Sequence, residues 1–443
     1  MEILIIGGIA AGMSIAAKAR RTNPSANVTI IEKEDYISFG ACGLPYYIGG
    51  QFNDINFMFA RSIEKAKEQG INLLLQHEAL SIDFDNKTVK VKDLNLNKES
   101  DLSYDRLAIA TGAYPLQALE NRRGLDNQYT VTKPYEVEDL KGKLDDVEDI
   151  VVIGGGFIGL EVAEQLAHLG KKVTLLQRSD RVMRKIFDPE FSEMLHNALI
   201  ESKVDLQLNT TLFDYKVEGN KIVEVITEKE NFKADIVIES LGFRPDTAFI
   251  DDPRLEKLKN GAIIIDEFGK TSIEDVYAAG DCATVYNIQR ESFYSALATY
   301  ANKMGRIIGE NIASKEQKPY IGALASAVIR VGDYGAGVTG LNEQDVKSLG
   351  LNYSTSMVET NNHANYWPGQ EKIYIKLVYE TDTRKILGAQ VFGKYGAAER
   401  LGALTMAVYN ENTFDELGFM DFAYSPPFAS TWDALNVAGN ASK

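Results

Sequence analysis

Cysteine and histidine are scarce in this chain of 443 residues, which holds only Cys42, Cys282 and four histidines. Two cysteines cannot form the disulfide scaffold of a small secreted protein, and such low usage is typical of a reducing compartment. No cysteine or histidine cluster has zinc-like spacing, so we expect no metal site. Proline is rare at 11 residues, while the apolar share of 45% is ordinary for a globular protein.

Basic residues are outnumbered, with 47 Lys and Arg against 63 Asp and Glu, for a net charge of −16. This acidic balance argues against nucleic acid and anionic membranes as partners, because both attract basic proteins. The uncharged stretch from Ile3 to Ala17 is interrupted by glycines and is too short to span a bilayer. We therefore expect a cytoplasmic protein with no nucleic-acid or membrane partner.

Two segments repeat the order strand, glycine turn, helix, strand. In the first, a strand over 3–6 precedes Gly7-Gly8-Ile9-Ala10-Ala11-Gly12, a helix over 13–21 and a strand over 28–31. The second begins 147 residues later (154 − 7), with a strand over 149–153, Gly154-Gly155-Gly156-Phe157-Ile158-Gly159, a helix over 160–169 and a strand over 172–176. A glycine turn that opens a helix lets backbone N–H groups approach a pyrophosphate. The repeat predicts two Rossmann domains.

The residue that follows the second strand differs between the two units. The first unit continues with Glu32, whose carboxylate is expected to bind ribose hydroxyls, although Ile9 replaces the second glycine of its turn. The second unit has all three glycines and continues as Gln177-Arg178-Ser179. Because an arginine accommodates a 2′-phosphate, Arg178 and nearby Arg181 favour NADPH, with NADH still possible.

From about residue 326 the pattern changes to strands, such as 326–331 and 372–378, and to a helix over 396–409. No nucleotide motif occurs in this region. The pattern predicts an α+β module that serves association.

Two further segments complete the pattern: Tyr104 to Gly112 is a predicted strand that ends in a small-residue turn, and Val276 to Asp281 is another, with an acid at its end. Together with the glycine turns, and in this order along the whole chain, they resemble the FAD-dependent pyridine nucleotide–disulfide reductases. The resemblance implies an α/β fold with two Rossmann-like domains and a C-terminal α+β dimerisation domain. It implies an FAD-binding domain of residues 1–115 and 250–325, an NAD(P)H-binding domain of 116–249, and an interface domain of 326–443 that forms a homodimer.

The resemblance also implies which residues bind the cofactors. Asp281 would hydrogen-bond the flavin ribityl chain, Thr111 and Gly112 would lie beside the FAD, and Phe157 would gate the nicotinamide pocket. The predicted cofactor-binding residues are Gly7, Gly8, Ala11, Gly12, Glu32, Lys33, Thr111, Gly112, Gly154, Gly156, Phe157, Ile158, Gly159, Arg178, Gly242 and Asp281.

Cys42 is the candidate catalytic residue. It lies between Gly40 and Gly43, after the predicted ribose-binding strand, and the onset of a helix behind it would favour the reactive thiolate. The dithiol reductases of the family carry a second cysteine close by, which this chain lacks, and Cys282 is interpreted as structural. Cys42 must therefore form a mixed disulfide with a small thiol or oxidise to sulfenic acid.

The single-cysteine members of the family include NADH oxidases, NADH peroxidases and coenzyme A–disulfide reductases. The oxidases and peroxidases usually carry a histidine in the first glycine turn, where this chain has Ala10. The segments 362–369 and 423–428 resemble the tyrosine segments of the coenzyme A–disulfide reductases, which reach into the partner's active site. The resemblance thus implies that Tyr366 and Tyr424 assist Cys42.

Coenzyme A is polyanionic, so a basic rim is expected at its site. The residues that resemble family contacts to coenzyme A are Arg20, Arg21, Ser38, Phe39, Asn302, Lys303 and Arg306. The sequence thus predicts a homodimeric FAD enzyme that reduces coenzyme A disulfide with NAD(P)H. A reductase of coenzyme A persulfide or polysulfide, a water-forming NADH oxidase, and a binding protein that has kept FAD but lost catalysis remain open.

Overall fold

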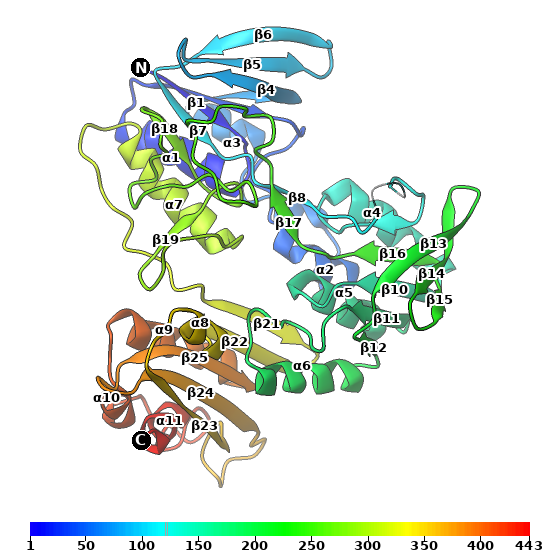
Figure 1. The fold of residues 1–443 in the computed structure, drawn as a ribbon, viewed down its shortest axis with the longest axis vertical. Coiled ribbons are helices and arrows are strands. Elements are labelled where there is room, and N and C mark those ends of the chain that lie inside the picture. Colours follow the sequence, from blue (N-terminus) through cyan, green and yellow to red (C-terminus); the bar gives the residue numbers. More distant parts are fainter. Residues whose placement is uncertain (120, 122) are drawn as a thin grey trace. The chain divides into compact units, whose positions relative to one another are not determined.

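A computed structural model describes residues 1–119, 121 and 123–443, and of Glu291 the main chain alone. The chain divides into two compact units. The first holds residues 1–43, 53–116 and 243–323, and the second holds residues 44–52, 117–242 and 324–443. Each unit contains one parallel sheet with a glycine motif directly after its central strand, and the second unit also contains the C-terminal module (Figure 1). The two Rossmann-like sheets and the C-terminal α+β module are therefore confirmed.

The first unit is built on a five-stranded parallel sheet whose central strand leads into the first glycine turn. Four of the five residues of this strand are buried, as expected for a parallel strand covered on both faces. In sheet order the strands are β18 (Val276–Ala278), β7 (Arg106–Ile109), β1 (Glu2–Ile6), β2 (Asn27–Glu32) and β3 (Ile71–Leu75).

Helix α1 (Ala10–Thr22) connects β1 to β2 and packs along α7 (Ala298–Asn311), as Figure 1 shows. The two helices approach closely because α7 carries Gly305 and Gly309 at the contact. A Cβ at Gly305 would lie 2.7 Å from the carbonyl oxygen of Ala11, and one at Gly309 would lie 2.5 Å from that of Ile15. This packing brings the exposed side chains of α7 next to α1.

Smaller elements complete the first unit. One antiparallel sheet joins β4 (His77–Asp83), β5 (Thr88–Asp93) and β6 (Lys98–Ser103). Two antiparallel strand pairs are β8 (Ala113–Pro115) with β17 (Phe243–Pro245), and β19 (Val285–Asn287) with β20 (Glu291–Phe293). The short helices are α3 (Ile63–Glu68) and the 3₁₀ turns η1 (Ala41–Gly43) and η2 (Ile55–Met58).

The second unit repeats this topology in its own parallel sheet. In sheet order its strands are β12 (Asp205–Leu208), β11 (Lys172–Gln177), β10 (Asp149–Ile153), β16 (Ile236–Glu239) and β9 (Gln128–Tyr129). An antiparallel sheet joins β13 (Leu212–Glu218), β14 (Lys221–Thr227) and β15 (Asn231–Lys233). The helices of this part are α2 (Leu44–Ile48), α4 (Pro134–Lys143), the 3₁₀ turn η3 (Leu144–Asp146), α5 (Phe157–His168) and α6 (Pro189–Glu201).

Both nucleotide helices begin earlier than predicted. Helix α1 starts at Ala10 rather than at Met13, and α5 starts at Phe157 rather than at Leu160. The last glycine of each turn, Gly12 or Gly159, thus belongs to the first turn of the helix. The first N–H groups of a helix have no hydrogen-bond partner within the helix. In both units these N–H groups belong to residues of the glycine motif.

The C-terminal module is a five-stranded antiparallel sheet with helices packed on it. In sheet order the strands are β21 (Ala327–Val331), β22 (Tyr334–Gly340), β25 (Ile386–Gly393), β24 (Lys372–Glu380) and β23 (Tyr353–Asn361). Helix α9 (Ala397–Tyr409) packs on β22 and β25, and α11 (Ala434–Ala441) packs on β23 and β24. Two shorter helices are α8 (Glu343–Ser348) and α10 (Phe414–Phe419).

A buried lysine ties this module to the second Rossmann sheet. Lys376 of β24 is 2% exposed and lies 3.1 Å from Asp188 and 3.0 Å from Glu190, at the start of α6, and 2.6 Å from Glu343 of α8. Gln390 of β25 donates to the same Asp188 carboxylate at 2.6 Å. The two parts of the second unit are thus joined by a charged cluster in which Lys376 and Asp188 are buried and the two glutamates are partly exposed. Among residues 1–119, 121 and 123–443, none of the helices combines the length and hydropathy needed to cross a bilayer.

Candidate active site

The first glycine turn fits a dinucleotide phosphate. Gly7 has φ +105°, and a Cβ there or at Gly12 would collide with a backbone carbonyl oxygen, of Ala110 or of Gly7. Ile9 precedes α1 as its N-cap without a side-chain capping bond, and the first turn of α1 holds no acidic residue. Ala11 is buried behind this turn. The helix therefore presents unpaired N–H groups and the positive end of its dipole to an anion.

Glu32 and Lys33 follow at the end of β2. Glu32 is buried, and its two carboxylate oxygens accept main-chain N–H groups from Gly8 at 2.5 Å and Glu34 at 2.9 Å. These bonds fix the carboxylate against the glycine turn, where a ribose would follow a pyrophosphate. Lys33 points elsewhere, since its Nζ binds Glu78 at 2.8 Å, and that hydrogen bond raises the pKa of Lys33.

Asp281 follows β18 and supplies an independent test for FAD. Burial raises the pKa of its carboxyl group, and within the described part of the chain no donor reaches that carboxylate. The main chain turns beside α1, since a Cβ at Gly280 would lie 3.2 Å from the Cβ of Ala11. A largely buried carboxylate without a partner, beside a phosphate turn, suits the hydroxyl groups of a ribityl chain. The residues of this unit therefore fit FAD.

Thr111 and Gly112 end the neighbouring strand, β7. The Thr111 hydroxyl donates to the carbonyl of Asp246 at 2.6 Å, so it braces the loop that follows β17. Gly112 has φ +69°, and a Cβ there would meet nothing within 4 Å. Gly112 thus faces open space on the same unit.

The second glycine turn, in the second unit, repeats the same contacts. Gly154 has φ +112°, and a Cβ there would collide with the carbonyl oxygen of Ser240, as one at Gly159 would with that of Gly154. Gly156 caps α5, and its missing side chain leaves space, since a Cβ would meet nothing within 4 Å. Phe157 and Ile158 open the helix half-buried. Gly242, with φ +95°, likewise faces open space after β16.

The end of β11 differs in charge from the end of β2. Gln177 accepts the N–H of Gly155 at 3.0 Å and so occupies the position that Glu32 has in the first unit. The next residue, Arg178, is exposed. Arg181 is half-buried, and its guanidinium lies 3.5 Å from Asp180. The group that accepts the glycine-turn N–H in the second unit is therefore a neutral amide and not a carboxylate.

Cys42 is exposed in η1, and α2 begins two residues later at Leu44. The segment lies against η2, which the sequence did not single out. Gly40 donates its N–H to the carbonyl of Met58 at 2.8 Å, and a Cβ at Gly43 would lie 3.2 Å from the Met58 methyl group. Glycines on either side of Cys42 thus allow a second backbone segment to approach closely.

Cys282 has the opposite environment. It is fully buried, and its thiol donates to the carbonyls of Ile109 at 3.4 Å and Ala279 at 3.3 Å. Burial raises the pKa of this thiol to about 11, so it stays protonated at neutral pH. A buried, protonated thiol is unreactive, which supports the structural interpretation of Cys282.

The two tyrosines predicted from separate segments meet. The hydroxyls of Tyr366 and Tyr424 are 2.8 Å apart, although the residues are 58 positions apart in the chain. Tyr366 is 72% exposed and Tyr424 is 45% exposed. The hydrogen bond with Tyr366 raises the pKa of Tyr424.

The predicted coenzyme A residues fall on three segments of the first unit. Arg21 is exposed at the end of α1. Burial and, as the smaller cause, the charge of Arg21 lower the pKa of the neighbouring Arg61. Asn302, Lys303 and Arg306 are exposed on α7, where Asn302 accepts a hydrogen bond from Ser14 of α1 at 3.0 Å. Arg61 was not found from the sequence, since only the folded chain brings it to Arg21.

Three of the predicted contacts have internal roles. The Arg20 guanidinium donates to the carbonyls of Pro24, Ala26 and Gln69 at 2.9, 2.5 and 3.3 Å. Phe39 is buried, with its ring centroid 5.0 Å from that of Phe59. Ser38 has φ +55°, and its N–H donates to the carbonyl of Gly8 at 3.0 Å. Their assignment to coenzyme A stays a prediction.

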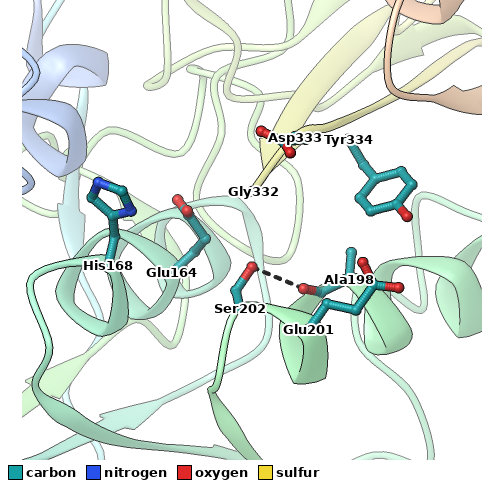
Figure 2. A pocket seen from close by; sticks show the side chains of 8 residues that line it. All are labelled: Glu164, His168, Ala198, Glu201, Ser202, Gly332, Asp333 and Tyr334. Atoms are coloured by element: carbon teal, nitrogen blue, oxygen red, sulfur yellow. Dashed lines mark hydrogen bonds between the residues drawn. The ribbon is translucent and has the colours of Figure 1, made fainter. Parts of the chain in front are cut away.

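A cavity of about 200 Å³ lies elsewhere in the second unit (Figure 2). Figure 2 shows Glu164 and His168 from α5, Glu201 and Ser202 from the end of α6, and Asp333 and Tyr334 from the turn between β21 and β22. None of the predicted site residues lines it. Within the described residues, no group of three or more His, Cys, Asp or Glu side chains could hold a metal ion.

Residues 1–305 match the pyridine nucleotide-disulphide oxidoreductase family, and residues 326–435 match the dimerisation domain of that family. The chain belongs to this family. It is an FAD flavoprotein oxidoreductase that uses NAD(P)H, and it ends in a dimerisation domain.

Relatives from this pyridine nucleotide-disulphide oxidoreductase family differ in their acceptors. An NAD(P)H coenzyme A polysulfide/persulfide reductase of Pyrococcus horikoshii is 34% identical, over 100% of this chain and 98% of the relative. An NADH oxidase of Enterococcus faecalis is 32% identical, over 100% and 99%. A coenzyme A disulfide reductase of Staphylococcus aureus is 29% identical, over 100% of both.

Two solved structures of an oxidase share this fold. The water-forming NADH oxidase of Lactobacillus brevis, bound to NADH, has a TM-score of 0.95 and 31% identity, over 100% of this chain and 98% of that one. An engineered mutant of it, an NADPH oxidase bound to NADPH, has a TM-score of 0.95 and 32% identity, over the same shares of the two chains. The acceptor of this family member must therefore be argued from its own residues.

Proposed function

We propose that the chain reduces coenzyme A disulfide with NADPH, and that Cys42 alone carries the thiol chemistry. The observation that supports this most directly is the contact of Tyr366 and Tyr424 at 2.8 Å on exposed loops. A disulfide that is split releases a thiolate, which needs a proton donor. Two hydrogen-bonded phenols on a dimerisation domain are suited to donate that proton.

The chemistry at Cys42 balances with one sulfur from the protein and two from the substrate. The Cys42 thiolate attacks one sulfur of the disulfide, so that an Sγ–S bond forms, the S–S bond of the substrate breaks, and one coenzyme A thiolate leaves. Bound FAD supplies the two-electron link from NADPH. Reduction of the mixed disulfide by these two electrons releases the second coenzyme A and returns Cys42 to the thiolate. Overall, one NADPH and one proton convert one disulfide into two thiols.

Either hydroxyl of the tyrosine pair can be the donor of this hydrogen bond. The bond raises the pKa of Tyr424, so this phenol keeps its proton at neutral pH. In the arrangement that we propose, Tyr424 donates to Tyr366, and the more exposed Tyr366 hydroxyl donates outward. In the proposed homodimer, Tyr366 would protonate the thiolate released at the partner subunit's Cys42.

A homodimer is supported by the aromatic side chains that the C-terminal module exposes. Phe419 is 76% exposed, Phe428 is 77% exposed and Trp432 is 54% exposed. Large exposed apolar side chains on one module indicate an interaction surface. The match of this module to a dimerisation domain supports the same proposal.

The preference for NADPH rests on the end of β11. A neutral Gln177 there does not repel a 2′-phosphate, and exposed Arg178 offers it a bidentate partner. Three of the five substitutions in the engineered NADPH oxidase remove an aspartate and place an arginine and a serine at the next two positions. This chain carries that Arg–Ser pair, as Arg178 and Ser179, behind a neutral residue.

Reduction of oxygen to water is the less favoured proposal. The first glycine turn has Ala10 where a histidine would serve a sulfenic acid. His77 is the one histidine in the sequence of the first unit, and its ring nitrogens face the Leu75 carbonyl at 2.7 Å and Asp93 at 3.7 Å. A coenzyme A persulfide is the second candidate, favoured by the relative from Pyrococcus horikoshii, because it would use the same cysteine and the same binding groups.

An anaerobic assay separates these acceptors. NADPH oxidation is followed by absorbance with coenzyme A disulfide, with coenzyme A persulfide, and with neither, and each is repeated in air. We expect anaerobic turnover with coenzyme A disulfide to exceed the rate in air without added acceptor by about 100-fold. This turnover should vanish in Cys42→Ser. The proposal fails if disulfide adds nothing to the aerobic rate. Faster turnover with the persulfide would assign the second candidate instead.

A mass measurement tests the thiol itself. We expect intact protein under non-reducing conditions to carry a coenzyme A adduct that dithiothreitol removes and that Cys42→Ser lacks. The matched variant Cys282→Ser keeps the adduct, because its thiol is buried and protonated.

A further inference from the structure

Arg400, on α9, joins the two loops that carry the tyrosines. Its Nη2 donates to the carbonyl of Asn362 at 2.9 Å and to that of Phe428 at 3.3 Å. Tyr366 lies four residues after Asn362 (366 − 362), and Tyr424 lies four residues before Phe428 (428 − 424). One guanidinium thus binds the main chain of both loops, in each case four residues from the tyrosine.

Asp433 orients this guanidinium. Its carboxylate accepts Nε at 3.0 Å and Nη2 at 2.6 Å, and the two side chains are 11% and 8% exposed. Such bidentate pairing fixes the plane of an arginine, which a lysine ammonium cannot reproduce. Asp433 is fixed in turn, because its Oδ1 also accepts the N–H of Leu435 at 2.9 Å and so caps α11.

The remaining donor of Arg400 is placed by a glycine. Nη1 donates to the carbonyl of Gly396 at 2.9 Å. Gly396 has φ +81°, and a Cβ there would lie 2.5 Å from Nη1, so a larger residue would displace the guanidinium. All three nitrogens of the Arg400 guanidinium therefore donate hydrogen bonds inside the C-terminal module.

The tyrosine loops need such a fixed point. Both hydroxyls are partly exposed, and a hydrogen bond between exposed groups contributes little against the entropy of ordering two loops. A main-chain hydrogen bond between the loops, from the Ala364 N–H to the Pro426 carbonyl, is long at 3.4 Å. The buried Arg400–Asp433 pair supplies order that the exposed contact cannot.

We propose that Arg400, oriented by Asp433, is the positioning residue that holds the Tyr366 and Tyr424 hydroxyls at bonding distance for protonation of the leaving thiolate. This inference rests on the proposed function of the tyrosine pair. Arg400 itself touches neither hydroxyl, so its effect on turnover passes through the tyrosines.

The test compares Arg400→Lys with a matched arginine in the same module. Arg384 pairs with Asp415 at 3.0 Å, and the two side chains are 53% and 49% exposed. Arg384→Lys therefore controls for loss of an arginine ion pair. Asp433→Asn is the second variant, which keeps an acceptor for the arginine but removes the charge, in case Arg400→Lys does not fold. FAD content and far-UV circular dichroism identify the folded variants.

The first readout needs no substrate. A 3-fluorotyrosine at position 424 is titrated by ¹⁹F NMR in the full-length holoenzyme. We expect the raised pKa of this phenol to fall to the ordinary value in Arg400→Lys and in Tyr366→Phe, and to persist in Arg384→Lys. A titration unchanged in Arg400→Lys and Asp433→Asn overturns the inference.

The second readout is a double-mutant cycle with coenzyme A disulfide. We expect Arg400→Lys to lower kcat by about 10-fold, to leave reduction of FAD by NADPH unchanged, and to add less than about 2-fold in a Tyr424→Phe background. If the losses in kcat of Arg400→Lys and Tyr424→Phe multiply in the double variant, Arg400 does not act through the tyrosine pair. A wild-type enzyme without disulfide turnover defeats the proposed function, while the ¹⁹F titration still decides whether Arg400 positions the pair.

Discussion

Gln177 accepts the N–H of Gly155 at 3.0 Å, in the place where Glu32 accepts the N–H of Gly8 at 2.5 Å. The two βαβ units thus use the same hydrogen bond from the second residue of the glycine turn. One acceptor is a carboxylate and the other an amide. We propose that the charge at this position separates a site for an unphosphorylated ribose from one that tolerates a 2′-phosphate.

Gln177→Glu is expected to convert the second site to NADH. The new carboxylate would keep the bond to Gly155 and would repel a 2′-phosphate, so we expect kcat/KM for NADPH to fall by about 10-fold or more relative to NADH. Arg178→Ala should act in the same direction. Lys172→Ala is the control, because Lys172 opens β11 and pairs with Glu148 at 2.7 Å. Steady-state kinetics with both nucleotides decide, and a ratio that stays constant in both variants contradicts the assignment.

The two cysteines are expected to differ in alkylation. Because burial raises the pKa of Cys282 to about 11, its thiol stays protonated at all pH values from 6 to 9, whereas Cys42 is exposed. We expect iodoacetamide to add one carbamidomethyl group at pH 8, at Cys42 alone, until the protein is unfolded. Peptide mass mapping gives the site. Modification of Cys282 in the folded protein at a comparable rate would show that its environment is open.

Much of the fold could be predicted because its signals are local. Gly7 and Gly154 are required by φ values above +100° and by carbonyls that a Cβ would strike, so these positions mark their turns within a few residues. The boundaries were less certain. The sequence placed the helix starts at Met13 and Leu160, because it could not tell that Ala10 and Phe157 already have helical backbone.

Pairs from distant segments could not be predicted. Arg400 and Asp433 are 33 residues apart, and nothing local marks the carbonyls that Arg400 binds. Arg20 shows the converse, since a basic residue at a helix end suggested a ligand contact, while the folded chain gives its guanidinium three carbonyl acceptors. Tyr366 and Tyr424 were singled out through a family resemblance, whereas the contact between their hydroxyls could be found only in the folded chain.

Glu161 is expected to make stability depend on pH. Burial raises the pKa of this carboxyl to about 7, even though Tyr46 donates to it at 3.0 Å. The folded pKa lies above the unfolded value of 4.5, so the neutral form is favoured in the fold. Its stabilising contribution is fully present below pH 4.5 and is lost as the pH rises through 7.

Glu161→Gln should remove this dependence, because a neutral amide can still accept from Tyr46. Relative to the variant, the wild type should lose roughly 2 kcal/mol of unfolding free energy between pH 5 and 8, at about 1.4 kcal/mol per pKa unit. Urea unfolding at both pH values measures this difference. Glu193→Gln, an exposed position on α6, is the control and should show no such change. Parallel pH curves for wild type and Glu161→Gln would mean that Glu161 is charged in the fold at pH 7.

Lys376→Met is expected to destabilise the second unit strongly. Burial opposes its charge, yet hydrogen bonds and attraction from Glu343, Asp188 and Glu190 raise the pKa of Lys376. Removing the ammonium leaves the buried Asp188 carboxylate with Gln390 as its remaining side-chain donor, which we expect to cost about 3–5 kcal/mol of unfolding free energy. Lys347→Met is the matched control, since Lys347 pairs with the same Glu343 at 3.1 Å but is 62% exposed, and it should destabilise the unit far less. Denaturant unfolding compares the two. Equal losses would show that Lys376 contributes no more than a surface ion pair, and that the C-terminal sheet is held to α6 by packing alone.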